Sequence, residues 1–240
     1  MDPDRRALLG MGGVLMLGAV FQPAGVRAQA ASPGRIGIIG SGHIGGKIGG
    51  LWIKKGHQVA FSSRHPDELK PMVAELGSLA RAGTVEEAIA FGDVLFIAVP
   101  YGAVPQIGKD YSAAMKGKVM LDACNAVSAR DGAVADEVEQ TGIGVTTQKY
   151  FPGVRIVRAF NTMSYMIFAR EANRPDPKLA VPIAGDDPQA VQIAAGLVRD
   201  AGFDPVVVPL QRAQEFAQGG PIYGQQLTAK ELRDRFGLLK

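Results

Sequence analysis

Residues 40–45 form a glycine-rich run, Gly-Ser-Gly-His-Ile-Gly, directly after the short apolar stretch 35–39. Such a stretch is typical of a buried parallel strand. The glycines permit a tight turn and let the backbone approach a pyrophosphate, whose charge is favoured at the N-terminus of the next helix. A strand before the run, a helix after it and a second strand at 58–61 make this spacing a prediction of a dinucleotide site.

The end of that second strand indicates which dinucleotide is bound. Sites for NAD usually place Asp or Glu there to hold the ribose diol, but this chain has Ser62, Ser63 and Arg64. A carboxylate would repel a 2′-phosphate, whereas hydroxyls and a guanidinium suit a dianion. We therefore predict NADP(H) rather than NAD(H). In the alternative interpretation, Arg64 is a solvated loop charge.

Two further segments, 99–101 and 159–162, follow predicted strands. Ligands of open α/β sheets lie at the carboxyl ends of the strands, so these segments converge on the same edge as the glycine run. Tyr101 and Asn161 are the best candidates for contacts with a substrate. An equally weighted alternative for each is a structural role, Tyr101 as a half-buried aromatic and Asn161 as the cap of a turn. His43 is expected beside the phosphates rather than as an acid or base. The chain offers no convincing general acid or base, which is compatible with hydride transfer by a positioned cofactor.

The elements that must position these residues alternate between strand and helix after Pro33. Strands are expected at 35–39, 58–61, 78–80, 93–99, 118–123, 155–160, 179–184 and 205–208. Helices are expected at 44–55, 66–76, 165–171, 188–199 and 227–236, with a brief one opened by the capping box at Thr84. This alternation predicts an α/β fold, a Rossmann-like doubly wound parallel sheet with a small C-terminal extension. Residues 31–210 would be the NADP-binding domain and 211–240 a helical tail.

Residues 1–30 have the three-part layout of an export signal. Arg5 and Arg6 precede an apolar, glycine-containing stretch at 7–21, and Ala28-Gln29-Ala30 offers a cleavage site. The paired arginines resemble a twin-arginine signal. The apolar stretch is about 15 residues, short of the ~20 that span a bilayer, so a retained anchor is the less favoured alternative. We predict a periplasmic protein without stable membrane insertion after cleavage, with a cytoplasmic location as the alternative.

The composition narrows the class of function. The chain has 240 residues, 47% hydrophobic and 20% charged, which is ordinary for a globular protein. Its formal net charge of +3 is too small to suggest nucleic acid as a partner. Three scattered histidines and one cysteine, Cys124, form no metal-ligand cluster. We expect Cys124 to be a packing residue, and the partner to be a small-molecule redox acceptor.

Four segments together resemble the NADPH-dependent deazaflavin (coenzyme F420) reductases: 36–45, 63–64, 94–100 and 181–187. The run 157–162 is also similar to the oxidoreductase domain of the six-transmembrane metalloreductases. The resemblance covers nearly all of residues 34–210. It implies a Rossmann-like domain, usually a homodimer, that exchanges hydride between NADPH and a deazaflavin or flavin.

The resemblance also implies roles for individual residues. The pyrophosphate would be held by the glycine run, the 2′-phosphate by the end of the second strand, and the nicotinamide by two later strand ends. In chain order, the expected cofactor contacts are Gly40, Ser41, Gly42, His43, Ile44, Gly45, Ser62, Ser63, Arg64, Val99, Pro100, Ala159 and Phe160. Two other functions stay open: an imine or keto reductase related to the pyrroline-carboxylate reductases, and a dinucleotide-binding module or redox sensor without catalysis.

Overall fold

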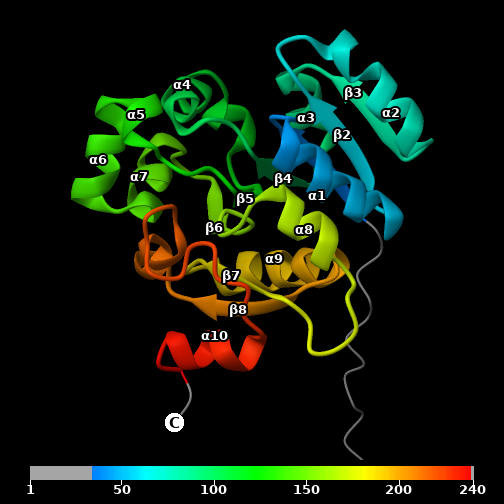
Figure 1. The fold of residues 1–240 in the computed structure, drawn as a ribbon. Coiled ribbons are helices and arrows are strands. Elements are labelled where there is room, and N and C mark those ends of the chain that lie inside the picture. The colour runs from blue at the N-terminus through cyan, green and yellow to red at the C-terminus, as the bar shows by residue number, and fades with distance from the viewer. Residues whose placement is uncertain (1–33, 239–240) are drawn as a thin grey trace, which may run out of the picture. The chain divides into compact units, whose positions relative to one another are not determined.

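An eight-stranded sheet in the order β3-β2-β1-β4-β5-β6-β7-β8 organises residues 34–238, the part of the chain that the computed structural model describes (Figure 1). The export signal predicted at residues 1–30 lies outside the described residues. The strands are β1 Arg35–Ile39, β2 Gln58–Ser62, β3 Ala80–Gly83, β4 Val94–Ile97, β5 Val119–Asp122, β6 Arg155–Arg158, β7 Ala180–Ala184 and β8 Asp204–Val208.

Helices cover both faces of this sheet, as the sequence predicted. On one face pack α1 His43–Lys54, α2 Lys70–Leu76, α8 Tyr165–Glu171 and α9 Pro188–Asp200. On the other pack α3 Val85–Phe91, α4 Val104–Met115, α6 Ala133–Thr141, α7 Ile143–Tyr150 and α10 Ala229–Arg235. The short α5, Ser128–Asp131, and three 3₁₀ turns, Pro66–Leu69, Tyr101–Ala103 and Leu210–Phe216, complete the fold. Among the described helices, none has the length and hydropathy needed to span a bilayer.

The first βαβ unit shows why these residues form these elements. Helix α1 buries Ile48, Trp52 and Ile53 against the sheet. Gly49 lets the helix approach closely, because a Cβ there would lie 2.5 Å from the Phe61 ring and 2.6 Å from Ile38. Glycine at this position is therefore what lets α1 pack closely on the sheet.

Two features of the sheet correct the sequence prediction. Strands β3, β2, β1, β4, β5 and β6 are parallel, but β7 runs antiparallel to β6. The apolar pattern of β7 is the same for either direction, and a single residue pair, Arg158 and Ala184, joins the two strands. Strand β6 also ends at Arg158 instead of residue 160, because Phe160 has a φ of 63° that turns the chain out of the sheet.

The C-terminal residues, expected as a helical tail, lie in the same compact unit as the sheet. Leu232 and Phe236 are buried in the core beside β7 and β8. The backbone N–H of Ala180 donates to the carbonyl of Leu227, which ties the segment before α10 to the start of β7. The fold therefore uses this segment to cover one face of its last two strands.

Asp187 caps the N-terminus of α9, its side chain accepting from the backbone N–H groups of Gln189 and Ala190. Its carboxylate also pairs with Arg155, Oδ2 to Nε at 2.6 Å, and this guanidinium is the main reason why the pKa of Asp187 is lowered to about 2. Because the folded-state pKa lies below the unfolded value, the pair stabilises the fold above pH ~4 and is lost as the pH falls toward 2.

We expect Asp187→Asn to keep the helix cap, because Asn caps well, and to remove the ion pair. The melting temperature of the variant should lie below that of the wild type at neutral pH, and the two should converge near pH 2. Thermal unfolding followed by circular dichroism between pH 2 and 7 measures this. A constant difference across that range would contradict the assignment.

Candidate cofactor site

The glycine run lies where the order of the sheet reverses, between β1 and β4. Crevices at such switch points are where open α/β sheets bind ligands. Gly40 has a φ of 94°, and a Cβ on it would lie 2.5 Å from Val99 Cγ1 and 2.6 Å from the carbonyl of Ala98. The turn after β1 is therefore held tightly against the end of β4 by a residue that must be glycine.

Gly42 has the opposite environment. It is exposed, its φ is −73°, and apart from its two chain neighbours no described residue has an atom within 4 Å of a Cβ placed on it. Helix α1 begins at the next residue, so its free backbone N–H groups and positive dipole end face the same open space. This open cradle fits a pyrophosphate approached by backbone atoms.

A cavity of about 720 Å³ opens beside the glycine run. It brings together residues that the sequence predicted as cofactor contacts from three segments far apart in the chain. Those that line it are Gly40, Ser41, Gly42, Ser62, Ser63, Arg64, Val99 and Pro100. Its volume is in the range of small-molecule and cofactor sites.

The serines at the end of β2 have structural partners of their own. Ser62 is fully buried and its hydroxyl donates to the carbonyl of Ile38, while its own carbonyl accepts from the Ser41 hydroxyl. Ser63 Oγ accepts from the backbone N–H of His65 at 3.0 Å. The hydroxyl of Ser62 is thus used within the fold, and its predicted contact with the cofactor stays a prediction. Arg64 is exposed and forms no ion pair with any described residue.

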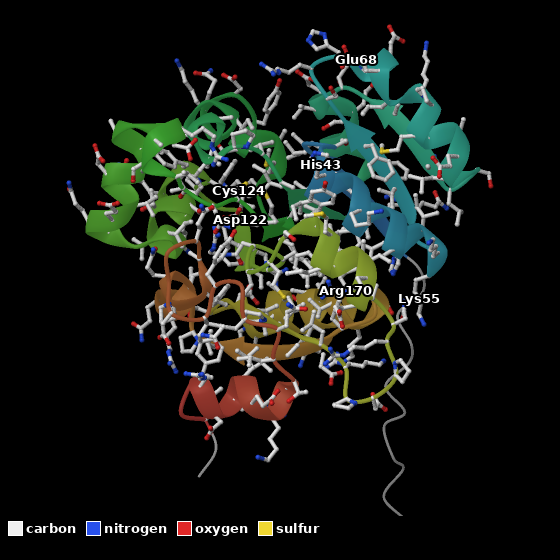
Figure 2. All side chains as sticks on the ribbon, viewed as in Figure 1. His43, Lys55, Glu68, Asp122, Cys124 and Arg170 are labelled. Atoms are coloured by element: carbon white, nitrogen blue, oxygen red, sulfur yellow. The ribbon has the colours of Figure 1, made fainter. Side chains whose placement is uncertain are left out.

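Sequence reasoning missed several residues that line this cavity. Leu69, Val85 and Ile107 offer apolar surface that suits the face of a planar base. Tyr111 lines the same region, and its hydroxyl donates to Glu86 at 2.8 Å. Ile107 and Tyr111 lie on one face of α4, so helical periodicity from residue 104 could have indicated them. Glu68 also lines the cavity and adds a negative charge near Arg64 (Figure 2).

Other predicted contacts lie outside this cavity. His43 stacks on Tyr165 and lines a second hollow. Gly45 is buried, and a Cβ on it would lie 2.0 Å from the carbonyl of Gly40, so it serves the turn itself. Ile44 packs partly buried against the core. Ala159 and Phe160 are fully buried, which leaves only their backbone for a contact with a nicotinamide.

The placement of Tyr101 corrects the sequence prediction. Its side chain is 0% exposed, and its hydroxyl is 3.0 Å from Thr147 Oγ1 on α7. Burial, followed by the nearby charge of Asp122, raises the pKa of the phenol well above its usual range. Tyr101 therefore fastens the end of β4 to α7 instead of touching a substrate.

Asn161 is also buried, 2% exposed, in the turn that follows β6. Its Nδ2 lies 3.2 Å from Asn125 Oδ1, and its carbonyl accepts from Asn125 Nδ2. Asn161 Oδ1 and Thr162 Oγ1 have no hydrogen-bond partner among the described residues. The strained φ of Phe160 next to them is the kind of feature that concentrates at functional turns. The predicted substrate contact of Asn161 stays a prediction.

A buried ion pair lies behind this turn. Arg158 Nη1 donates to Asp122 Oδ2 and Nη2 donates to the carbonyl of Cys124; both charged side chains are fully buried. The Cys124 thiol accepts from the backbone N–H of Val99, and burial raises the pKa of the thiol (Figure 2). A protonated, buried thiol is a packing residue, as the sequence predicted.

The fold and this crevice define a Rossmann-like, nucleotide-binding protein. Residues 35–126 match the model of the family described as NADP oxidoreductase, coenzyme F420-dependent. That match confirms the resemblance predicted from the sequence and covers the glycine run, the end of β2 and the end of β4. No match was found among curated protein sequences.

Solved structures with the same fold include a hypothetical protein from Sinorhizobium meliloti, 24% identical, with a TM-score of 0.68 over 81% of this chain and 95% of that chain. A candidate F420-dependent NADP-reductase from Arthrobacter sp. FB24 is 19% identical, with a TM-score of 0.67 over 84% of this chain and 94% of that one. An imine reductase from Myxococcus stipitatus is 13% identical, with a TM-score of 0.53 over 86% of this chain and 60% of that one.

Proposed function

We propose that the protein is an NADP(H)-dependent oxidoreductase that transfers hydride between NADPH and a flavin or deazaflavin. The observation that carries the choice of cofactor is Arg64. It lines the cavity at the end of β2, where an NAD site has a carboxylate, and it forms no ion pair with a described residue. The match of residues 35–126 to the F420-dependent family supports the choice of acceptor.

A nicotinamide dinucleotide held in this cavity would supply the hydride, and the acceptor would take up two electrons with one further proton from water. The residues of this chain bind and orient. Helix α1 and Gly42 receive the pyrophosphate, and Arg64 the 2′-phosphate. The buried turn at Phe160 sets the position of the ring. Placement alone accounts for large rate effects, which agrees with the lack of an evident acid or base.

Oxidation of NADPH by purified protein lacking residues 1–30 tests the proposal. Riboflavin, its 5′-phosphate (FMN), a deazaflavin and a cyclic imine are compared as acceptors, without oxygen, by the loss of NADPH absorbance. We expect turnover with a flavin or the deazaflavin. Turnover with the imine alone would instead support the imine reductase. Saturable NADPH binding without oxidation by any acceptor would support a non-catalytic module.

We also propose export, from the layout of residues 1–30, and a homodimer, from the resemblance. The mass of the N-terminal peptide of protein from a periplasmic extract tests cleavage after Ala30. Light scattering of the purified protein tests the dimer.

A further inference from the structure

A second cavity, of about 680 Å³, lies on the outer side of α1. It shares Ser41 and Gly42 with the cofactor cavity, so the two hollows meet at the glycine run. Helix α2 lines it through Met72, Glu75 and Leu76, and α8 contributes Tyr165. The dinucleotide predicted for the first cavity does not account for this second one.

The helix face that lines the second cavity is positively charged. His43, Lys47 and Lys54 all lie on it, at helical spacings of four and seven residues that keep them on one side. Both lysines are exposed, and neither forms an ion pair with a described residue. Glu75 is the acidic residue of the lining. Two unpaired ammonium groups therefore face the hollow against one carboxylate.

Aromatic rings form the end of the cavity next to the glycine run. His43, at the start of α1, stacks on Tyr165, at the start of α8, with ring centroids 4.3 Å apart and planes within 9°. Tyr165 follows the turn at Asn161 by four residues, so these rings stand close to the end of β6, where the nicotinamide is predicted. Helices α1 and α8 are in contact, which fixes this arrangement.

The distance along α1 separates this hollow from the pyrophosphate site. Lys54 lies eleven residues beyond His43 in the helix, about 16 Å at 1.5 Å per residue. Lys47 could reach a phosphate bound at the helix start, but Lys54 could not. A ligand that uses both ends of the cavity must have a ring at one end and a negative charge well away from it.

We propose that this second cavity binds the hydride acceptor, with a planar ring against Tyr165 and His43 and an anionic side chain that extends along α1 to Lys47 and Lys54. The inference rests on the proposed function and deepens it. It specifies the acceptor as an anionic flavin or deazaflavin, carrying a phosphate or carboxylates, in preference to a neutral one.

Riboflavin and FMN differ only in the 5′-phosphate that carries the negative charge, so their affinities test the proposal. NADP⁺ binding is measured first by calorimetry, and each flavin is then titrated into the NADP⁺-saturated protein by quenching of flavin fluorescence. We expect FMN to bind about tenfold more tightly than riboflavin, with the ratio falling as salt rises. The double variant Lys47→Glu, Lys54→Glu should bring the ratio to one or below, because both charges then repel the FMN phosphate, whereas riboflavin is neutral.

Lys55→Glu is the matched control. Lys55 caps the C-terminal end of α1 and is exposed, but does not line the cavity (Figure 2). The single variant Lys54→Glu should reduce the FMN preference by about fivefold, and Lys55→Glu by less than about twofold. The same comparison is made with a deazaflavin that carries its acidic side chain and with one that lacks it. It distinguishes recognition of carboxylates, as on the deazaflavin, from recognition of the FMN phosphate.

Equal binding of riboflavin and FMN by the wild type, joined by equal binding of both deazaflavins, would overturn the proposal. So would equal losses in Lys54→Glu and Lys55→Glu. After either result, the proposed function still holds if a flavin oxidises NADPH. If NADP⁺ binds but no acceptor is ever reduced, the proposed function fails instead, and a charge-dependent FMN affinity would still support the cavity.

Discussion

Replacing Arg64 with alanine is expected to weaken NADPH binding by roughly ten- to hundredfold, the value of one charge-assisted contact of about 1.5–3 kcal/mol. Binding of NADH should change by less than about twofold, because NADH lacks the 2′-phosphate that the guanidinium would receive. The difference between the two cofactors is the informative quantity. A general disturbance of the site would weaken both.

The neighbouring Glu68 provides a matched variant of opposite sign. Its carboxylate lines the same cavity, so Glu68→Gln should strengthen NADPH binding by a few fold and leave NADH nearly unchanged. Calorimetric titration of the three proteins with both dinucleotides measures these effects, and thermal unfolding checks that each variant is folded. If Arg64→Ala lost equal affinity for NADPH and for NADH, the 2′-phosphate could not be bound at the end of β2.

The parts of the fold that could be predicted depend on short-range signals. The turn at the glycine run and the capping box at Thr84 are each contained in a few residues, and each forms as predicted. The same holds for most strands of the parallel sheet, whose apolar runs are recognisable without knowledge of their neighbours. The glycine run and the ends of β2 and β4 were predicted from such signals, and they line one cavity, whereas the apolar residues that α4 adds to its lining were missed.

Long-range contacts decide the parts that could not be predicted. Tyr101 can be buried because its hydroxyl has a hydrogen-bond partner in Thr147, which lies on α7. Phe160 tolerates a positive φ because rings from distant segments, Trp52 and Phe203 among them, enclose its side chain. Helix α4 was missed because Gly108 discourages a helix. That glycine is required by Tyr150, whose carbonyl would lie 2.2 Å from a Cβ at position 108.

These differences change the description of the nicotinamide end. The sequence predicted Tyr101 as a substrate contact and Ala159 and Phe160 as nicotinamide contacts, whereas the side chains of all three are fully buried. Near these strand ends, Val99 and Pro100 line one cavity, and His43 and Tyr165 line the other. The chain therefore offers aliphatic and aromatic surfaces there, which would suit the placement of two stacked heterocycles.

Replacing Gly42 with valine is expected to reduce the affinity for both NADPH and NADH by roughly a hundredfold or more. Apart from its two chain neighbours, no described residue has an atom within 4 Å of a Cβ at this position, so the new side chain would project into the open cradle without disturbing the protein. It would then occupy the space of the pyrophosphate, and overfilling a fitted site costs about 1–3 kcal/mol or more. The loss should be the same for both dinucleotides, in contrast to Arg64→Ala.

Graded variants separate this effect from damage to the fold. Gly42→Ala should lose less affinity than Gly42→Val, and both should unfold within a few degrees of the wild type, since φ at Gly42 is −73° and suits any residue. Gly40→Ala should lower the melting temperature instead, because φ there is 94° and a Cβ would lie 2.5 Å from Val99. Calorimetry and thermal unfolding of the three variants measure both quantities. If Gly42→Val bound both dinucleotides as tightly as the wild type, the start of α1 could not be where the pyrophosphate lies.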